Sequence, residues 1–326
     1  MKFELQETDV SGLEHYLKTK EVIKPDERIT RLAKAGEGNM NLTLRAELDE
    51  RNLIVKQANP FVQKYPSIAA PVERAEMEHA FFKTAKSINK IAHYLPWPLF
   101  HDEENHIQVM EDLGRQGDYS KYYSADLKLP PRLTHHLVEF LKLLHSSTQK
   151  GKPISNLKMR QLNHAHIFEI PFDPENGLNL DETQAGLQAM AEKYVLTNPQ
   201  LRKIAAELGE IYLSANGPAL LHGDFFPGSW LDTEKGVKII DPEFCFSGPV
   251  EFELGVLKAH LIFCGMSNRG INTILRRYGD YDKARVDQFA GIEILRRLFG
   301  VAQLPLSRTI SEKEEITRIA LNLLNL

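Results

Sequence analysis

The stretch that decides the fold begins at residue 220 and reads Leu220-Leu221-His222-Gly223-Asp224-Phe225-Phe226-Pro227-Gly228-Ser229-Trp230-Leu231. An apolar run leads into a short polar turn, and the chain then becomes apolar again. Residues 232–236 have the composition of a hairpin turn, and a second apolar run follows that ends in Asp241-Pro242-Glu243. Each run predicts a strand that ends in a carboxylate, and we expect both carboxylates to face one cleft.

Carboxylates at these positions suit phosphoryl transfer, which needs an oriented acceptor hydroxyl and a divalent cation beside the phosphate oxygens. We assign Asp224 the role of orienting the hydroxyl and accepting its proton, and Asp241 the main metal-ligand role. Glu243 is expected to serve the same cation, with Ser229 as a further oxygen ligand. Such hard oxygen ligands favour Mg²⁺. His222 is expected to brace the loop by hydrogen bonding rather than to ligate the metal. The alternative is that the three carboxylates only end turns and hairpins.

The residues before this stretch predict an antiparallel sheet. Short strands separated by polar turns are expected between residues 28 and 57, and a helix is expected over 71–86, where Pro71 stands in the first turn. A further hairpin over 99–110 completes the sheet. Helical patterns follow near 131–147, 182–213, 250–265, 282–300 and 311–325. The sequence therefore predicts an α+β fold, with an N-terminal lobe over 1–112 and a larger, mainly helical lobe over 113–326.

A glycine turn between the first two expected strands is a candidate phosphate-binding loop. Gly36 and Gly38 permit close approach of the backbone, so amides around Asn39 are predicted to cover a triphosphate. No Gly-Lys-Ser/Thr sequence supports a P-loop. The alternative is an ordinary hairpin turn.

Lys56 at the end of the third expected strand supplies a cation for the α- and β-phosphates of ATP. Glu78 on the following helix is the preferred partner to orient it through an ion pair, ahead of Glu76 and Glu73. A surface lysine and a solvated helical glutamate are the alternatives.

The junction between the two expected lobes carries the candidate adenine-binding residues Met110, Glu111 and Leu113. Their backbone is predicted to hydrogen-bond the adenine edge while apolar neighbours hold the ring. An ordinary strand-to-helix connection is the alternative interpretation.

Composition narrows the class of protein further. The 326 residues carry a formal net charge of -4, so nothing indicates a nucleic-acid partner. The first residues lack the pattern of a secretory signal, and the apolar stretch 254–264 is too short to cross a membrane. The two cysteines, Cys245 and Cys264, are too few for a disulfide scaffold. We therefore expect a cytoplasmic protein without a membrane partner, and a homodimer is left open.

These residues together resemble the aminoglycoside phosphotransferase and choline kinase superfamily, whose fold is similar to that of protein kinases. Within it the chain is most similar to the 5-methylthioribose kinases. The resemblance covers most of the chain and is carried by four further segments: residues 36–41, 54–58, 109–113 and 241–244. Gly228-Ser229 also resembles the methylthioribose kinase form of a site where many members have a metal-binding asparagine.

A late segment, residues 293–300, is similar to the substrate segment with paired arginines in these kinases. The resemblance implies that Arg296 and Arg297 approach the sugar and its transferred phosphate. Guanidinium groups suit both hydroxyl recognition and phosphate charge. A solvated helical pair is the alternative. The loop 65–71 departs from the family pattern, because it lacks the expected tryptophan.

The resemblance implies a kinase that uses ATP and Mg²⁺ to phosphorylate a small alcohol, with the 1-hydroxyl of 5-methylthioribose in methionine salvage as the preferred acceptor. Another acceptor, such as an aminoglycoside, choline or homoserine, is the second hypothesis. A catalytically silent nucleotide-binding protein on the same scaffold is the third.

Overall fold

The computed structural model describes residues 2–36, 38, 40–124, 126–214 and 217–326. Its contacts divide the chain into two compact units. The first holds residues 1–117 together with 232–243, and the second holds residues 118–231 together with 244–326. The segment that ends in Asp241 and Glu243 therefore packs with the N-terminal residues. The lobe boundary expected at residue 112 stays a prediction.

The first unit is built on a five-stranded antiparallel sheet with the strand order β1-β2-β3-β7-β6. Its strands are β1 (Ile29–Lys34), β2 (Leu42–Leu48), β3 (Asn52–Gln57), β6 (Pro98–Asp102) and β7 (Ile107–Glu111). The expected meander and hairpin are thus present, with β7 pairing beside β3. This order places the end of β3, where Lys56 lies, opposite Gln108 in the centre of the sheet.

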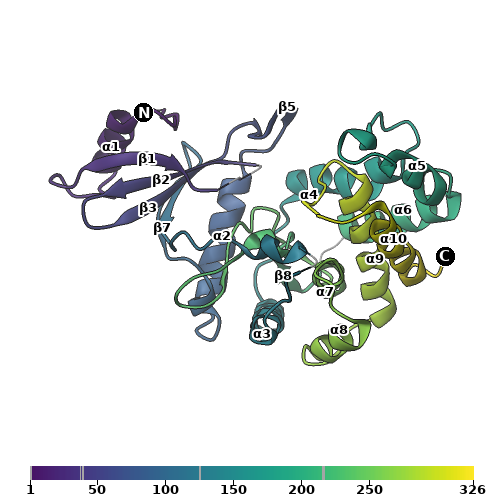
Figure 1. Cartoon of the computed structure of the whole chain (residues 1–326). Helices are drawn as coiled ribbons and strands as arrows, with labels where there is room; N and C mark the ends of the chain where they lie inside the picture. Colours follow the sequence, from purple (N-terminus) through teal and green to yellow (C-terminus); the bar gives the residue numbers. More distant parts are fainter. Residues whose placement is uncertain (1, 37, 39, 125, 215–216) are drawn as a thin grey trace. The chain divides into compact units, whose positions relative to one another are not determined.

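Helix α1 (Val10–Thr19) packs against this sheet (Figure 1). Its buried side chains Leu13, Tyr16 and Leu17 join the strand residues in one apolar cluster. Asp9 caps the helix by accepting a hydrogen bond from the Gly12 amide at 2.8 Å. The short hairpin of β4 (Phe61–Val62) and β5 (Tyr65–Ala69) precedes helix α2 (Arg74–Lys86). Gln108 on β7 donates to the carbonyl of Ala75 at 2.7 Å, which ties α2 to the sheet.

The second unit is mainly helical. Its α-helices are α3 (Pro131–Thr148), α4 (Leu157–His164), α5 (Leu187–Ala191), α6 (Pro199–Ser214), α7 (Val250–Phe263), α8 (Asn268–Leu275), α9 (Lys283–Phe299) and α10 (Ile310–Leu323). The short strands β8 (Ala219–Leu221) and β11 (Phe246–Gly248) pair with each other in antiparallel register. The segment expected to be helical over 182–213 is divided, since a π-helical turn follows α5 and Pro199 begins α6.

Helices α7 and α9 form the centre of this unit and position its polar side chains. Their close packing requires Gly255 on α7, because a Cβ there would lie 2.5 Å from Cβ of Phe289. Helix α7 is buried around nearly its whole circumference. It nevertheless carries Glu253 and His260, and α9 carries Glu293. Buried charges of this kind need partners, so these helices indicate where the polar site of the unit lies.

In the described part of the chain, none of the helices combines the length and apolar character required to cross a bilayer.

Candidate functional site

The first unit brings three of the candidate residues into one ion-pair cluster, which we call the lysine cluster. Nζ of Lys56 lies 2.9 and 3.0 Å from the two carboxylate oxygens of Glu78 and 2.7 Å from Oδ1 of Asp241. Lys56 and Glu78 are buried, whereas the Asp241 side chain is 48% exposed. Asp241 is therefore the member of the cluster that ligands in solvent can reach.

Asp241 has a left-handed backbone, with φ of +59°. Aspartate tolerates this conformation better than most residues, yet it remains less favourable than the extended or right-handed forms. Such positions gather at functional sites, where the surrounding contacts hold them. The contact with Lys56 is one such constraint on the Asp241 side chain.

A second pair of contacts fixes Glu243 beside this cluster. Asn41 donates to Oε2 of Glu243 at 2.6 Å and accepts from Nε of Arg74 at 2.7 Å. Arg74 is fully buried, lies 3.6 Å from Glu243 and also donates to the carbonyl of Met40. The arginine thus connects the start of α2, the residues after the glycine turn and Glu243. With Arg74 and Glu243, the lysine cluster holds three carboxylates and two cations.

The pKa values of the buried groups follow this imbalance of charge. Burial raises the pKa of Glu78 to about 7, and the nearby Asp241 and Glu243 act in the same direction against Lys56. Burial likewise raises the pKa of Glu243, although Lys56 and Arg74 oppose the change. Burial would lower the pKa of Lys56, but Asp241, Glu78 and Glu243 outweigh it, and the pKa rises. The cluster therefore keeps a charged lysine and has more negative charge than its own cations balance.

The glycine turn lines a hollow of about 170 Å³ in the first unit. Gly36 and Gly38 are both exposed, and Gly36 has φ of +119°, a conformation that favours glycine. Lys34 and Lys64 line the same hollow and give it positive charge. Asn39, the third residue assigned to this turn, lies outside the described residues.

The candidate adenine residues lie at and after the end of β7. Met110 is buried and pairs with Ile54 of β3, and Glu111 ends the strand. Oε1 of Glu111 accepts from the Trp97 amide at 2.8 Å, and Leu113 is half-buried. These contacts place the residues at and just after the C-terminal end of the inner strand β7, and their role in holding adenine stays a prediction.

A second cluster, which we call the arginine cluster, lies in the second unit around Asp224. Nη2 of Arg297 lies 2.8 Å from Oδ1 of Asp224, and Nη2 of Arg296 lies 3.5 Å from the same oxygen. Both contacts use Oδ1, which leaves Oδ2 as the oxygen available to an acceptor hydroxyl. The guanidinium of Arg297 also lies 4.7 Å from the centre of the Phe226 ring.

The two arginines differ in how fully their donors are used. Nε of Arg297 donates to Glu293 at 2.8 Å, Nη1 faces the carbonyl of Ala302 at 3.4 Å, and Nη2 holds Asp224. Nε of Arg296 donates to Glu293 at 2.5 Å, but among the described residues its Nη1 has no hydrogen-bond partner. Arg296 is therefore the arginine with donors left for a ligand.

Glu293 compensates the charge of both arginines. Burial would raise its pKa, but Arg296, Arg297 and a hydrogen bond from His260 reverse the change and hold the pKa well below its usual range. The carboxylate therefore stays charged at neutral pH. The arginine cluster contains two carboxylates, Asp224 and Glu293, and two guanidiniums, so its charges balance.

The backbone that leads into Asp224 is held by Glu253. Its Oε2 accepts from the His222 amide and its Oε1 accepts from the Gly223 amide, both at 2.9 Å. Gly223 has φ of +88°, and a Cβ there would lie 2.1 Å from the carbonyl oxygen of Phe244, so only glycine fits. Next in the chain, the Asp224 amide faces Nδ1 of His222 at 3.4 Å. The loop before the carboxylate is therefore closely defined.

Ser229 lies in the second unit, where its hydroxyl donates to the backbone carbonyl of Asp224 at 3.0 Å. Its assignment as a metal ligand stays a prediction. Among the described residues, no group of three or more histidine, cysteine, aspartate or glutamate side chains is arranged to hold a metal ion. A magnesium site would not require one, since Mg²⁺ often takes one or two carboxylates together with phosphate and water oxygens.

Sequence reasoning missed several residues of these clusters. Arg74 stands one helical turn before Glu78, and that spacing on one helix face was the available signal. Glu293 stands three and four residues before the arginines, which also predicts contact on a helix. Tyr123, Glu253 and His260 gave no such signal, because their partners are distant in the sequence.

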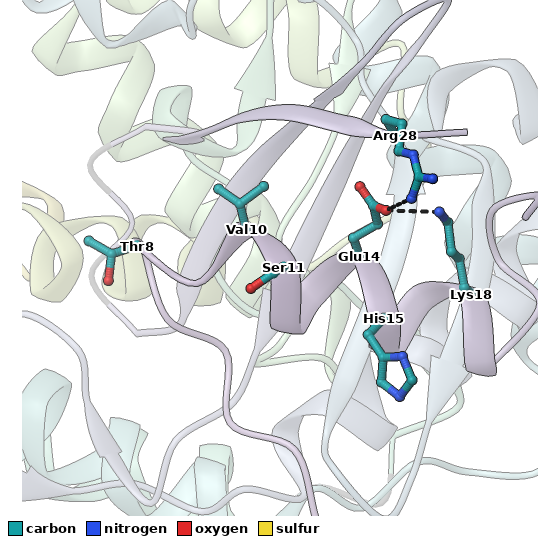
Figure 2. A pocket seen from close by; sticks show the side chains of 7 residues that line it. All are labelled: Thr8, Val10, Ser11, Glu14, His15, Lys18 and Arg28. Atoms are coloured by element: carbon teal, nitrogen blue, oxygen red, sulfur yellow. Dashed lines mark hydrogen bonds and ion pairs between the residues drawn. The ribbon is translucent and has the colours of Figure 1, made fainter. Parts of the chain in front are cut away.

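A further hollow of about 480 Å³ lies beside α1 (Figure 2). Glu14 points toward Lys18 and Arg28 there, and its oxygens accept from both side chains and from the Ile29 amide. The bond from Lys18 is the main cause that lowers the pKa of Glu14 to about 2. Because these charges already compensate one another, we assign no ligand to this hollow.

Comparison with solved structures supports the fold. Choline kinase LicA from Streptococcus pneumoniae has a TM-score of 0.51 at 14% identity, covering 97% of this chain and 99% of that one. Spectinomycin phosphotransferase, in a complex with ADP and spectinomycin, has a TM-score of 0.52 at 14% identity, covering 98% and 100%. The predicted α+β class, with a sheet in the N-terminal part and helices in the C-terminal part, is confirmed.

Comparison of sequences identifies the relatives. The chain is 30% identical to the methylthioribose kinase of Exiguobacterium sibiricum over 79% of its own length and 64% of that relative. It is also 30% identical to the methylthioribose kinase of Bacillus velezensis over 72% of its length and 61% of that relative. The alignment thus spans less than two thirds of either relative. Residues 31–289 match the phosphotransferase enzyme family, and this chain belongs to that family.

Proposed function

We propose that the chain transfers the γ-phosphoryl group of ATP to a hydroxyl of a small molecule, and that 5-methylthioribose is the preferred acceptor. The contact of buried Lys56 with both Glu78 and Asp241 carries this proposal. A lysine oriented by a helical glutamate is the arrangement that phosphate anchoring requires, and the adjacent carboxylate suits a metal ligand. Met110, Glu111, Leu113 and the glycine turn complete the proposed nucleotide side.

The donor set of the lysine cluster fits Mg²⁺. Asp241 is half-exposed and offers carboxylate oxygen, and Glu243 offers a second carboxylate two residues later. The three carboxylates of the cluster exceed its two cations, so a bound cation would relieve repulsion among them. Asp241 and Glu243 would hold the ion, which would supply charge neutralisation at the phosphate oxygens when bound. Ser229 remains the proposed further oxygen ligand.

Asp224 is the proposed catalytic residue. Its Oδ2 would accept the hydrogen bond of the acceptor hydroxyl and take the proton as the new bond forms. The acceptor oxygen bonds to the γ-phosphorus while the bond from phosphorus to the β–γ bridging oxygen breaks, so that its electron pair leaves with ADP. The contacts of Arg297 and Arg296 with Oδ1 fix the direction in which Oδ2 points.

The arginines also narrow the class of acceptor. Two guanidiniums within 3.5 Å of Asp224 disfavour a cationic acceptor such as an aminoglycoside or choline, because like charges repel strongly where water is excluded. Arg296, with donors to spare, suits the hydroxyl groups of a sugar and the phosphate that forms on it. The 30% identity to methylthioribose kinases makes methylthioribose the first sugar to test.

The experiment is an assay of ADP release by the purified full chain with ATP, Mg²⁺ and a panel of alcohols. The panel holds 5-methylthioribose, an aminoglycoside, choline and homoserine. We expect release that depends on 5-methylthioribose and exceeds release with the other three. Greater ADP release with a cationic alcohol would show that this alcohol, and not 5-methylthioribose, is the preferred acceptor. Tight ATP binding without acceptor-dependent release would instead favour a catalytically silent protein.

A further inference from the structure

Two buried side-chain triads of the same composition lie in the second unit, and both end beside Asp224. In one, the Tyr278 hydroxyl lies 2.9 Å from Nδ1 of His145, whose Nε2 lies 3.0 Å from Glu253. In the other, the Tyr123 hydroxyl lies 2.7 Å from Nδ1 of His260, whose Nε2 lies 3.0 Å from Glu293. We name them the backbone triad and the arginine triad after the groups that their glutamates hold.

The glutamates fix one proton in each triad. A carboxylate only accepts hydrogen bonds, so Nε2 of each histidine carries a proton and donates to its glutamate. Burial lowers the pKa of His260 and raises the pKa of Tyr123 well above its usual value, so both remain neutral at pH 7. Nδ1 of His260 therefore accepts from the Tyr123 hydroxyl. The pKa values of Glu253 and Glu293 are lowered, so both triads end on an ionised glutamate.

The two glutamates act on different parts of the same residue. Glu253 accepts from the amides of His222 and Gly223 and so sets the backbone that precedes Asp224. Glu293 accepts from Nε of both arginines and so sets the guanidiniums that contact the Asp224 carboxylate. Within the described part of the chain, neither glutamate forms a hydrogen bond or ion pair with Asp224, and each acts through an intermediary.

We propose that the two triads are a positioning device that orients Asp224 from its backbone and from its carboxylate separately. The residues Tyr123, His260 and Glu293 would govern the arginine pair, and Tyr278, His145 and Glu253 would govern the loop. A carboxylate that must present one oxygen to a hydroxyl gains from constraint at both ends, because small displacements reduce the rate of transfer steeply. The kinetic role of this device rests on the proposed function.

Matched substitutions separate the two triads. Glu293→Gln leaves one acceptor oxygen where three donors converge, so the guanidiniums lose their orientation. We expect an acceptor KM about tenfold higher, a lower kcat and an unchanged KM for ATP. Glu253→Gln disturbs only the loop, so we expect kcat to fall about tenfold with the acceptor KM within about twofold of the wild type. Tyr123→Phe should repeat the pattern of Glu293→Gln more weakly, and Tyr278→Phe that of Glu253→Gln. These two variants replace a glutamate variant that does not fold.

Kinetics of these four variants of the full chain, with ATP, Mg²⁺ and 5-methylthioribose, form the first arm of the test. The proposal is supported if the arginine-triad variants chiefly raise the acceptor KM and the backbone-triad variants chiefly lower kcat. Equal changes in all parameters, in proportion to lost thermal stability, would show that the triads are only structural. A wild type that turns over while all four variants match it would also overturn the proposal and leave the proposed function intact.

The second arm needs no acceptor. Nitrogen-15 spectra of the histidine rings in the full chain should show His145 and His260 with the proton on Nε2, and Glu293→Gln should change the signals of His260 alone. If the wild type phosphorylates no tested alcohol, the proposed function fails while these spectra still decide the triads. A His260 ring protonated on Nδ1, or one that titrates near its ordinary pKa, would refute the arginine triad.

Discussion

The lysine cluster and the arginine cluster contain the same kinds of residue but differ in their balance of charge. The lysine cluster sets three carboxylates, Glu78, Asp241 and Glu243, against two cations. The arginine cluster sets two carboxylates against two guanidiniums. Buried glutamates respond accordingly, since the pKa values of Glu78 and Glu243 are raised and that of Glu293 is lowered. We infer that the first cluster is suited to binding a cation, whereas the balanced charges of the second hold its own residues in place.

The largest effect is expected at the arginine cluster, for Asp224→Asn. The amide cannot take the hydroxyl proton, so kcat should fall about 1,000-fold while the affinity for ATP stays unchanged. The measurement is steady-state kinetics beside ATP binding by calorimetry. Asp280→Asn, at an exposed position of the same unit, serves as the control and should behave as the wild type. A fall of less than tenfold in Asp224→Asn would remove the catalytic role from Asp224.

A smaller effect is expected at the lysine cluster, for Asp241→Asn. Asparagine also tolerates the left-handed backbone at φ of +59°, so the substitution mainly removes charge. We expect kcat/KM for ATP to fall about 100-fold and the concentration of Mg²⁺ required for half-maximal rate to rise. The measurement is the initial rate across a series of Mg²⁺ concentrations. An unchanged Mg²⁺ requirement would contradict the assignment of Asp241 as a metal ligand.

Replacement of each arginine by lysine should affect different kinetic constants. Lysine keeps the positive charge but lacks the forked set of guanidinium donors. Arg296→Lys should raise the acceptor KM about tenfold, because Nη1 of Arg296 has no hydrogen-bond partner among the residues that the structure describes. Arg297→Lys should chiefly lower kcat, because each of the three guanidinium nitrogens of Arg297 contacts a protein group and Nη2 contacts Asp224. Kinetics with varied acceptor at saturating ATP make the test. Equal changes in acceptor KM and kcat in the two variants would mean that Arg296 and Arg297 do not have different roles.

A smaller effect is expected for the pH dependence of stabilisation by Mg²⁺, which should reflect the excess of carboxylates in the lysine cluster. A raised carboxyl pKa means that folding favours the protonated form, so stability is lost as the pH rises from about 4.5 toward the folded value of about 7 for Glu78. A bound cation would offset this loss. Addition of Mg²⁺ and ADP should therefore raise Tm more at pH 8 than at pH 6, and Glu243→Gln should reduce the difference. Equal shifts at both pH values would refute the imbalance of charge.

The smallest effect is expected outside both clusters, for Glu14→Gln beside α1. The substitution removes partly exposed ion pairs with Lys18 and Arg28, and such pairs contribute about 1 kcal/mol or less. Urea unfolding should show a small loss of stability, and the kinetic constants should stay unchanged. A changed KM for ATP or for the acceptor would mean that this hollow takes part in ligand binding.

Local patterns explain which parts of the fold could be predicted. The strands from residue 29 to 57 follow from short apolar runs and polar turns, and α2 follows from its composition and from Pro71. Helix α1 was not anticipated, although Asp9 stands at its start as a favoured cap. The region 182–213 was expected to be helical, but periodicity did not show that a π-helical turn and Pro199 divide it.

The candidate site shows the same limit at longer range. Lys56 and Glu78 form the ion pair that their residue types and the helix after β3 led us to expect. The contact of Asp224 with Arg297 joins residues 73 positions apart, and that of Lys56 with Asp241 joins residues 185 apart. No periodicity spans such separations, because packing of the whole unit sets them. Residue types indicated the chemistry, whereas the pairing of charges required the fold.

The most direct test of the account is phosphorus-31 NMR of the wild-type chain with ATP, Mg²⁺ and 5-methylthioribose. We expect a new sugar-phosphate signal that grows in equal measure with ADP and is absent without Mg²⁺ and in Asp224→Asn. Loss of ATP to inorganic phosphate alone, or no reaction of ATP with this or any other alcohol of the panel, would contradict it.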